Sequence, residues 1–214
     1  MTSSRVRRRW LWIGLAVLAL VAAPFEFILI VRLTGSWKQM YVVAESMEPT
    51  LKREDRFLAW TRPPATISRG DILLVTVREN VTYVQRVAAI SGDTIELVGG
   101  LVVINGRPVQ QRRIGSAQGF DGRPAALLSE QFPGEATPHH IYDSGYTDLD
   151  DFPAQRVAPG HVFLLGDNRD VSADSRVPRE HGGVEQVRMS GVRGAPWFFT
   201  WTTDGGRFGR SAAH

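Results

Sequence analysis

The hydrophobic pattern divides the chain into one long apolar run and a series of short ones. "WLWIGLAVLALVAAPFEFILIV" extends from Trp10 to Val31, with Pro24 and Glu26 as its two weak points. A helix of this length covers roughly 30 Å at about 1.5 Å per residue, which is the hydrocarbon thickness of a bilayer. Because the apolar residues before Glu26 outweigh the cost of one carboxylate, we expect a transmembrane helix over residues 10–33.

The charges beside this run predict its orientation. Four arginines lie on its N-terminal side: Arg5, Arg7, Arg8 and Arg9. Basic flanks stay in the cytoplasm, so residues 1–9 are expected there and the rest of the chain on the opposite side of the membrane. A cleaved signal peptide is the competing interpretation, since "LVAAP" offers small residues. We favour an uncleaved anchor because the run resumes as "FEFILIV" beyond that point.

The remaining chain has the pattern of antiparallel β-strands. Short runs rich in β-branched residues are separated by Gly, Asp, Asn and Pro. The expected strands are residues 40–44, 56–60, 71–77, 82–90, 94–98, 101–104, 161–165 and 184–192. Asn105-Gly106 stands between two apolar stretches, which strongly predicts a tight hairpin. The fold class is therefore mostly β, in one domain over residues 36–203.

Two segments lack this pattern. Residues 111–160 contain many Gly, Pro and Asp residues, and we expect an irregular lobe inserted between strands of the domain. The last residues, 204–214, are small, polar or charged, and we expect them to be disordered.

Composition excludes several classes of function. The chain has no cysteine, which excludes disulfides, thiol catalysis and cysteine metal sites. The net charge of +3 is concentrated at the long apolar run, and the rest of the chain is nearly neutral. A nucleic-acid binder needs a basic face on its folded part, so nucleic acid is not an expected partner. The acidic clusters have no recognisable ligand spacing, and we expect no metal and no organic cofactor.

Two short stretches carry candidate chemistry. "VVAESMEPTL" contains a lone serine, Ser46, whose hydroxyl needs a base before it can act as a nucleophile. By itself such a serine is typical of a turn or cap. "GDNRDVSADSR", residues 166–176, is unusually dense in polar side chains. It predicts either an exposed loop held by side-chain hydrogen bonds or a network that fixes an active site.

The order of the motifs distinguishes between these interpretations. "SMEPTL", "RGDILLV", "YVQRVAAISGD" and "GDNRDVSADSR" follow one another behind the apolar run. This ordered set resembles bacterial type I signal peptidases from about residue 36 to residue 200, with residues 111–160 poorly matched. The resemblance implies a barrel-like domain of several antiparallel sheets and a Ser–Lys dyad that cleaves exported preproteins after a small-x-small sequence.

The resemblance also implies a role for individual residues. Ser46 aligns with the nucleophile, and Ser172 with the serine that hydrogen-bonds the basic lysine. Asp174 and Arg176 align with a structural ion pair behind the site. Val42 and Val84 align with apolar walls of the substrate pockets.

Two positions depart from the family pattern. The family lysine precedes arginine in "Y-[IV]-K-R", and here Gln85 holds that place. A glutamine amide donates and accepts hydrogen bonds but has no useful basicity, so it cannot take the proton of Ser46. Ala44 stands where many relatives have a hydroxyl that helps to bind the oxyanion.

Other side chains are weaker candidates for the base. The lysines and histidines considered are Lys38, Lys52, His139, His140 and His161, and each is more typical of a surface position. Glu45 and Glu48 flank the serine but are poorly placed to reach its hydroxyl.

Two functions therefore remain open. The first is a membrane-anchored serine endopeptidase that removes signal peptides with a substituted base. The second is an inactive paralogue that binds signal peptides or assists an active peptidase in the same membrane. Both have exported preproteins or signal peptides and the lipid bilayer as partners.

Overall fold

The structure is a computed structural model that describes residues 12–13, 26, 29, 35–78, 81–119, 122, 124–207 and 209–211. The transmembrane helix expected over residues 10–33 lies almost entirely outside the described residues. Within the part that is described, no helix has the length and apolarity needed to cross a bilayer. The chain divides into two compact units, Met1–Lys38 and Gln39–His214, and the second holds the three sheets of the fold almost completely.

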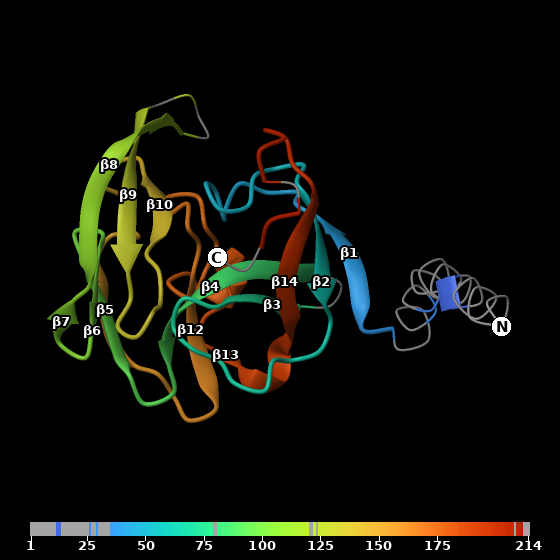
Figure 1. Cartoon of the computed structure of the whole chain (residues 1–214). Helices are drawn as coiled ribbons and strands as arrows, with labels where there is room; N and C mark the ends of the chain where they lie inside the picture. Colours follow the sequence, from blue (N-terminus) through green and yellow to red (C-terminus); the bar gives the residue numbers. More distant parts are fainter. Residues whose placement is uncertain are drawn as a thin grey trace, which may run out of the picture. The chain divides into compact units, whose positions relative to one another are not determined.

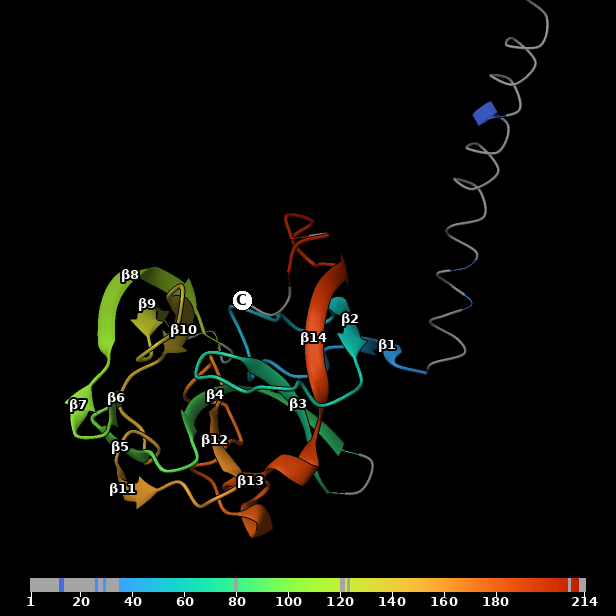
Figure 2. The same ribbon diagram turned by 60° about the horizontal axis from the view of Figure 1, so that its bottom comes forward.

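The largest sheet has seven strands in the order β1-β2-β14-β3-β4-β12-β13 (Figure 1). Its strands are β1 (Trp37–Tyr41), β2 (Arg56–Trp60), β3 (Ile72–Arg78), β4 (Val81–Ile90), β12 (His161–Leu165), β13 (Val187–Arg188) and β14 (Val192–Trp201). β14 comes last in the sequence but lies between β2 and β3, as Figure 2 shows. The C-terminal part of the chain is thereby built into the middle of the sheet.

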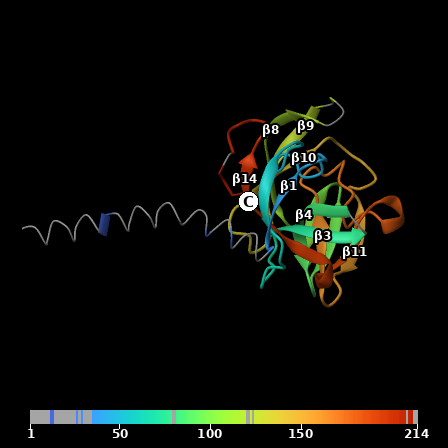
Figure 3. The same cartoon turned by 90° about the vertical axis from the view of Figure 1, so that its right-hand side faces the viewer.

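Two smaller antiparallel sheets complete the domain. One has the order β11-β5-β6-β7 and the other the order β10-β9-β8. Their strands are β5 (Thr94–Val98), β6 (Leu101–Ile104), β7 (Arg107–Pro108), β8 (Gln110–Gln118), β9 (Pro124–Gln131), β10 (His139–Asp143) and β11 (Phe152–Arg156). Figure 3 shows β8, β9 and β10 together in one part of the domain, away from β11. The mostly β fold class with antiparallel sheets is confirmed.

Alternation along β3 explains how the central sheet is buried on both faces. Ile72 and Leu74 pack in one apolar cluster with Met47 and Phe57, whereas Leu73 and Val75 pack in another. Successive side chains of a strand point to opposite faces, so a continuous apolar run such as "ILLV" fits a strand that is covered on both sides. The site described below lies on the face that carries Met47.

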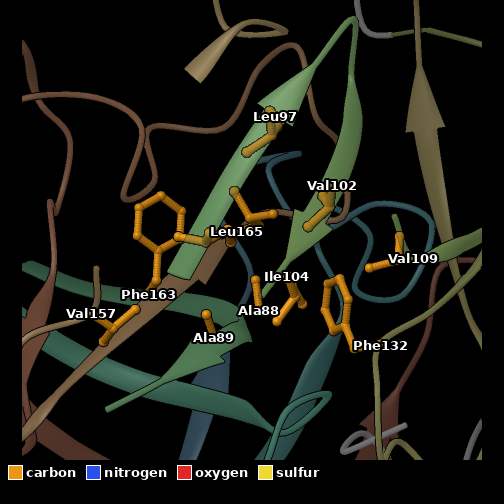
Figure 4. Packing of buried hydrophobic residues seen from close by; sticks show 11 residues of the cluster. Ala88, Ala89, Leu97, Val102, Ile104, Val109, Phe132, Val157, Phe163 and Leu165 are labelled. Atoms are coloured by element: carbon orange, nitrogen blue, oxygen red, sulfur yellow. The ribbon is translucent and has the colours of Figure 1, made fainter. Parts of the chain in front are cut away.

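A third apolar cluster lies where β4 and β12 meet the β11-β5-β6-β7 sheet (Figure 4). The residues labelled in that view are Ala88, Ala89, Leu97, Val102, Ile104, Val109, Phe132, Val157, Phe163 and Leu165. Phe163 also contacts Phe152 of β11 edge to face, with ring centroids 5.2 Å apart. These contacts join the small sheet to the central one.

The predicted hairpin at Asn105-Gly106 is confirmed. β6 ends at Ile104 and β7 begins at Arg107, so the two residues alone form the connection. Asn105 has φ 54° and Gly106 has φ 74°. Positive φ at both central residues is the requirement of a type I′ turn, which Asn-Gly meets at little steric cost.

The irregular lobe expected over residues 111–160 is wrong in part, because this segment contains β8 to β11. β9 shows the physical reason. In "PAALLSEQ" the buried positions are Ala125, Leu128 and Glu130, which do not follow a strict alternation and include a charged side chain. An apolar alternation is therefore absent from the sequence although the strand is well paired.

Two strand boundaries also differ from the prediction. The strand expected over residues 40–44 is β1 and ends at Tyr41. Of the strand expected over residues 184–192, Val187–Arg188 pairs as β13 and Met189–Gly191 forms a 3-10 turn, η2; another, η1, is Arg179–His181. The sequence pattern does not predict β14 because Gly194 and Pro196 interrupt it. Gly194 is required by close approach, since a Cβ there would lie 1.8 Å from the Trp60 carbonyl oxygen.

Candidate functional site

Ser46 opens a turn over residues 46–50, in the connection between β1 and β2. It lines an apolar cavity of about 200 Å³ together with Val42 and Val84. The rest of the wall comes from residues 81–83 and from Met40, Tyr41, Val43, Ala44, Met47, Leu51 and Phe57. The two valines predicted to form pocket walls therefore do lie beside this serine, on the face of the sheet that carries Met47.

The turn that carries Ser46 is fixed by the loop that follows β12. The backbone amide of Asn168 donates a hydrogen bond of 3.0 Å to the carbonyl oxygen of Ser46. At the other end of the turn, the hydroxyl of Thr50 donates a hydrogen bond of 2.5 Å to Oδ2 of Asp167. The two motifs that the sequence separates by more than a hundred residues thus meet directly, through Asp167 and Asn168.

Gly166 marks how closely these motifs approach. A Cβ placed on Gly166 would lie 2.1 Å from the Oγ of Ser172 and 2.5 Å from the carbonyl oxygen of Ser46. Both distances are far below van der Waals contact, so no side chain fits at this position. Ser172 and the backbone of Ser46 therefore lie against the same residue.

Gln85 lies in β4 directly after Val84, but it faces away from the cavity. It pairs with Leu73, whose side chain packs on the opposite face of the sheet from Met47. Its Nε2 donates a hydrogen bond of 3.0 Å to the carbonyl oxygen of Ala173. Among the described residues, Gln85 Oε1 and Ser172 Oγ are buried without a hydrogen-bonding partner.

Asp174 and Arg176 form a buried ion pair, as expected. Arg176 donates from Nε to Oδ1 of Asp174 at 2.9 Å and from its second nitrogen to Oδ2 at 2.8 Å. Asp174 also accepts a hydrogen bond of 3.0 Å from the amide of Gly166. Two parallel N–H to oxygen contacts fix the relative orientation of the groups. This pair therefore holds the glycine against which Ser172 packs.

A second buried ion pair lies under the turn of Ser46 and was not predicted as part of the site. Arg86, which is 2% exposed, donates two hydrogen bonds of 2.8 Å to Asp167 and one of 2.7 Å to the carbonyl oxygen of Gly70. The signal for it in the sequence is an arginine inside the apolar strand "YVQRVAAI", because a buried charge needs a partner. Asp167 thus accepts a hydrogen bond from Thr50 and is itself held in place by Arg86.

His139 links the β10-β9-β8 sheet to this charged group. Its Nδ1 lies 2.9 Å from Oε1 of Glu135, and its Nε2 lies 3.2 Å from Oε2 of Glu130. Glu130 also forms an ion pair with Arg169, which follows Asn168 in the loop after β12. His139 is therefore buried and not the surface residue that the sequence suggested.

The protonation of this group follows from its charges. Burial disfavours the charged imidazole, but the bonds to Glu130 and Glu135 outweigh it and raise the pKa of His139 above its ordinary value. Burial acts in the opposite sense on Glu130, yet the charge of Arg169 and the contact with His139 lower its pKa to about 2. His139 therefore holds its proton to a higher pH than an ordinary imidazole does.

The other basic side chains considered for Ser46 have different partners. Lys52 forms an ion pair with Asp204 at 3.2 Å, and the Nδ1 of His161 lies 2.9 Å from the carbonyl oxygen of Pro159. His140 is exposed next to the buried His139. Within the described ranges, no lysine or histidine is hydrogen-bonded to the hydroxyl of Ser46.

Some described residues of the segment 204–214, for which we expect disorder, contact the same connection between β1 and β2. Arg207 donates a hydrogen bond of 2.6 Å to the carbonyl oxygen of Thr50 and one of 2.8 Å to Asp55. Its guanidinium also lies over the ring of Phe199, 4.7 Å from the centroid. Arg207 thus has three kinds of partner, all distant from it in the sequence or on β14.

In the part of the chain that the structure describes, no three His, Cys, Asp or Glu side chains are grouped to bind a metal ion. The site is composed instead of a serine beside an apolar cavity, two buried ion pairs and two buried polar atoms without partners. This arrangement suits an extended peptide with small apolar side chains, whose backbone and side chains fill such a cavity.

Comparison with known proteins agrees with these features. A family described as "Signal peptidase, peptidase S26" matches residues 8–198. Signal peptidase I of Rickettsia akari is 32% identical over 120 residues, which cover 51% of this chain and 44% of the relative. Signal peptidase I of Bacillus amyloliquefaciens is 32% identical over 64% of each chain, and that of Bacillus licheniformis is 27% identical over 85% and 84%.

The matches differ in how much of each relative they include. The chain spans less than two thirds of the length of the first two relatives and most of the length of the third. The family match covers almost the entire β domain, including the segments that carry Ser46 and Gln85. The predicted resemblance to bacterial type I signal peptidases is thus confirmed at the level of the family.

Proposed function

Since this chain belongs to the signal peptidase family, peptidase S26, we propose that it is a serine endopeptidase that removes signal peptides from exported preproteins. The observation that supports this function best is the position of Ser46 on an apolar cavity whose wall includes Val42 and Val84. A cavity of about 200 Å³ with a mostly apolar wall accepts apolar side chains such as those of a small-x-small sequence.

In this proposal Ser46 is the nucleophile. Its Oγ attacks the carbonyl carbon of the scissile bond, the leaving amine departs with a proton, and water then hydrolyses the acyl ester to regenerate the serine. Ser172, Asp174 and Arg176 support the site, because the ion pair holds Gly166 and Gly166 sets the distance between Ser172 and the Ser46 backbone.

We propose further that turnover is slow, because Gln85 occupies the position of the family's lysine. The amide cannot accept the proton of Ser46, and its Nε2 is already bound to the Ala173 carbonyl oxygen. General-base catalysis typically contributes about 10²–10⁴-fold to the rate, and this chain loses that contribution.

The proposal includes the membrane. Residues 1–9 lie in the cytoplasm, residues 10–33 form a single anchor, and residues 36–203 form the domain on the far side. Such an anchor keeps Ser46 within some fifteen residues of the bilayer, where preproteins emerge. Exported preproteins and the lipid bilayer are then the partners of the chain.

A second function is favoured by Gln85 alone. The chain would keep the peptide cavity without the chemistry, bind signal peptides, and assist an active peptidase in the same membrane. The buried amide of Gln85 supports this candidate, because it is hydrogen-bonded to the Ala173 carbonyl oxygen and offers no base to the serine.

Cleavage of a preprotein by the purified full-length chain in detergent micelles tests the proposal. We expect slow release of the signal peptide, and its abolition by Ser46→Ala. Binding of a fluorescent signal peptide without any cleavage would favour the second function. Neither binding nor cleavage would contradict both.

A further inference from the structure

The C-terminal residues are bound to the connection that carries Ser46, although they contribute nothing to the cavity wall. We call the described residues 202–207 and 209–211 the C-terminal strap, and residues 42–55 the nucleophile loop. Resting on the proposed function of Ser46, we propose that the strap positions the nucleophile loop for peptide binding and cleavage, and that Arg207 is the residue through which it acts.

The first support is that Arg207 contacts two separate points of the nucleophile loop. One guanidinium nitrogen donates to the carbonyl oxygen of Thr50 at 2.6 Å, and another donates to Oδ2 of Asp55 at 2.8 Å. Thr50 ends the turn that Ser46 opens, and Asp55 ends the nucleophile loop. One rigid planar group therefore fixes two points of the loop at a set separation, which a lysine ammonium cannot do.

Asp55 is the point where strap and loop are joined. Its side chain is fully buried and accepts hydrogen bonds from the Lys52 amide at 2.8 Å and from the Thr203 amide at 3.1 Å, in addition to Arg207. A buried carboxylate holds its donors strongly because each unmade hydrogen bond leaves a desolvated charge. Thr203 and Arg207 of the strap are thus both bound to the carboxylate of Asp55.

Backbone hydrogen bonds connect Asp55 to the cavity wall. Val42, which lines the cavity, donates its amide to the carbonyl oxygen of Asp55 at 2.9 Å and accepts a bond of 2.9 Å from the Glu54 amide. A shift of Asp55 therefore moves Val42, and a shift of Thr50 moves the turn of Ser46. None of the residues that line the cavity belongs to the strap, so Arg207 acts through the loop and is a positioning residue.

The loop needs such support because it has little regular structure of its own. It contains no strand between Tyr41 and Arg56, and its internal backbone bonds are a few isolated turns. The loop after β12 holds its turn from one side, through Asn168 and Asp167. The strap holds it through Thr50 and Asp55, and the two supports together define where Ser46 lies.

The test uses the full-length chain in detergent micelles with Arg207→Gln, and with Arg210→Gln as a matched control. Arg210 is an exposed arginine of the same strap, so the control removes the same charge without touching Thr50 or Asp55. The probe is a fluorescent peptide with an apolar stretch followed by Ala-x-Ala. Two quantities are measured: the Kd of the peptide, and hydrogen exchange of backbone amides in residues 42–55.

We expect Arg207→Gln to raise Kd by about fivefold to tenfold and to accelerate exchange selectively in the nucleophile loop. A lower folded fraction by itself raises the apparent Kd by the reciprocal of that fraction, so the folded fraction of each variant is measured by circular dichroism and the shift in Kd is corrected for it. Arg210→Gln should leave both quantities within about twofold of wild type. Unchanged Kd and unchanged exchange in Arg207→Gln would overturn the proposal.

If Arg207→Gln does not fold, Asp204→Asn replaces it. Asp204 is partly exposed and accepts from Nε of Arg207 at 3.2 Å and from Lys52 at 3.2 Å, so its loss weakens the strap without leaving a buried charge unpaired. A smaller shift in the same two quantities supports the proposal, and no shift contradicts it. If the wild-type chain binds no peptide, the proposed function fails, whereas the exchange measurement still decides whether the strap orders the loop.

Discussion

The amide nitrogen of Gln85 donates a hydrogen bond of 3.0 Å to the carbonyl oxygen of Ala173, the residue next to Ser172. Gln85 is therefore joined to the backbone of the loop that carries Ser172. Gln85 Oε1 and Ser172 Oγ remain buried without partners among the described residues. Gln85 is 1% exposed, and burial of this degree lowers the pKa of a lysine placed there.

Gln85→Lys should therefore restore a base. We expect the rate of preprotein cleavage to rise by about 10²-fold, because a neutral amine can accept a proton that the amide cannot. Residue 85 does not line the cavity, so the amine has to approach Ser46 from the side of Ser172 and Gly166. The measurement is release of the signal peptide at pH 8, with Gln85→Met as the control for loss of the amide alone. Equal rates for the lysine and methionine variants would show that a base at position 85 does not act on the hydroxyl of Ser46.

Gly166→Ala should disrupt the site with little loss of fold. The added methyl group meets the Ser172 hydroxyl at 2.1 Å and the Ser46 carbonyl oxygen at 2.5 Å, so one of the two must move. We expect peptide affinity to fall by about tenfold. Gly115→Ala is the matched control, because its methyl group meets only Leu127 at 3.7 Å, an ordinary contact. Wild-type affinity in both variants would refute the geometry described for Gly166.

Arg176→Met should destabilise the domain by about 3–5 kcal/mol, since it leaves Asp174 buried without its partner. Urea unfolding measures the loss. The double variant with Asp174→Asn removes the unpaired charge as well, and should recover part of the stability. If the double variant is less stable than Arg176→Met, the buried charge is not the cause.

His139 should make stability depend on pH. Its pKa is raised in the folded state, so its contribution is fully present below the ordinary pKa near 6.5 and is lost as pH rises through the raised value. The difference in unfolding free energy between wild type and His139→Gln should therefore shrink between pH 6 and pH 9, by at most about 1.4 kcal/mol per pH unit.

A chain that begins at residue 34 should be soluble and folded, because the three sheets lie almost wholly in the unit Gln39–His214. Circular dichroism and a cooperative thermal transition are the measurements. Aggregation of correctly expressed protein would mean that the β domain depends on the membrane.

The sequence predicted best where a local rule decides the structure. β2, β5, β6 and β12 begin and end at the predicted residues, and the Asn105-Gly106 hairpin forms as its turn chemistry requires. The family motifs also predicted that Val42 and Val84 lie beside Ser46.

The sequence predicted the structure poorly where contacts between residues far apart in the chain determine it. β9 turns Glu130 inward because Arg169, which lies 39 residues further along the sequence, neutralises it together with His139 of the paired strand β10. The same holds for Arg207, whose partners Thr50 and Asp55 precede it by about 150 residues. A charged side chain looks like a surface residue until its partner is known.

The strap has a consequence for the order in which the chain matures. Arg207 follows Ser46 in the sequence and leaves the ribosome well after it. Contacts of such high sequence separation form late, after the chain between them has folded. The nucleophile loop is therefore synthesised before the residue that we propose supports it. Under that proposal, the site becomes competent only once the strap has been synthesised and has folded onto the loop.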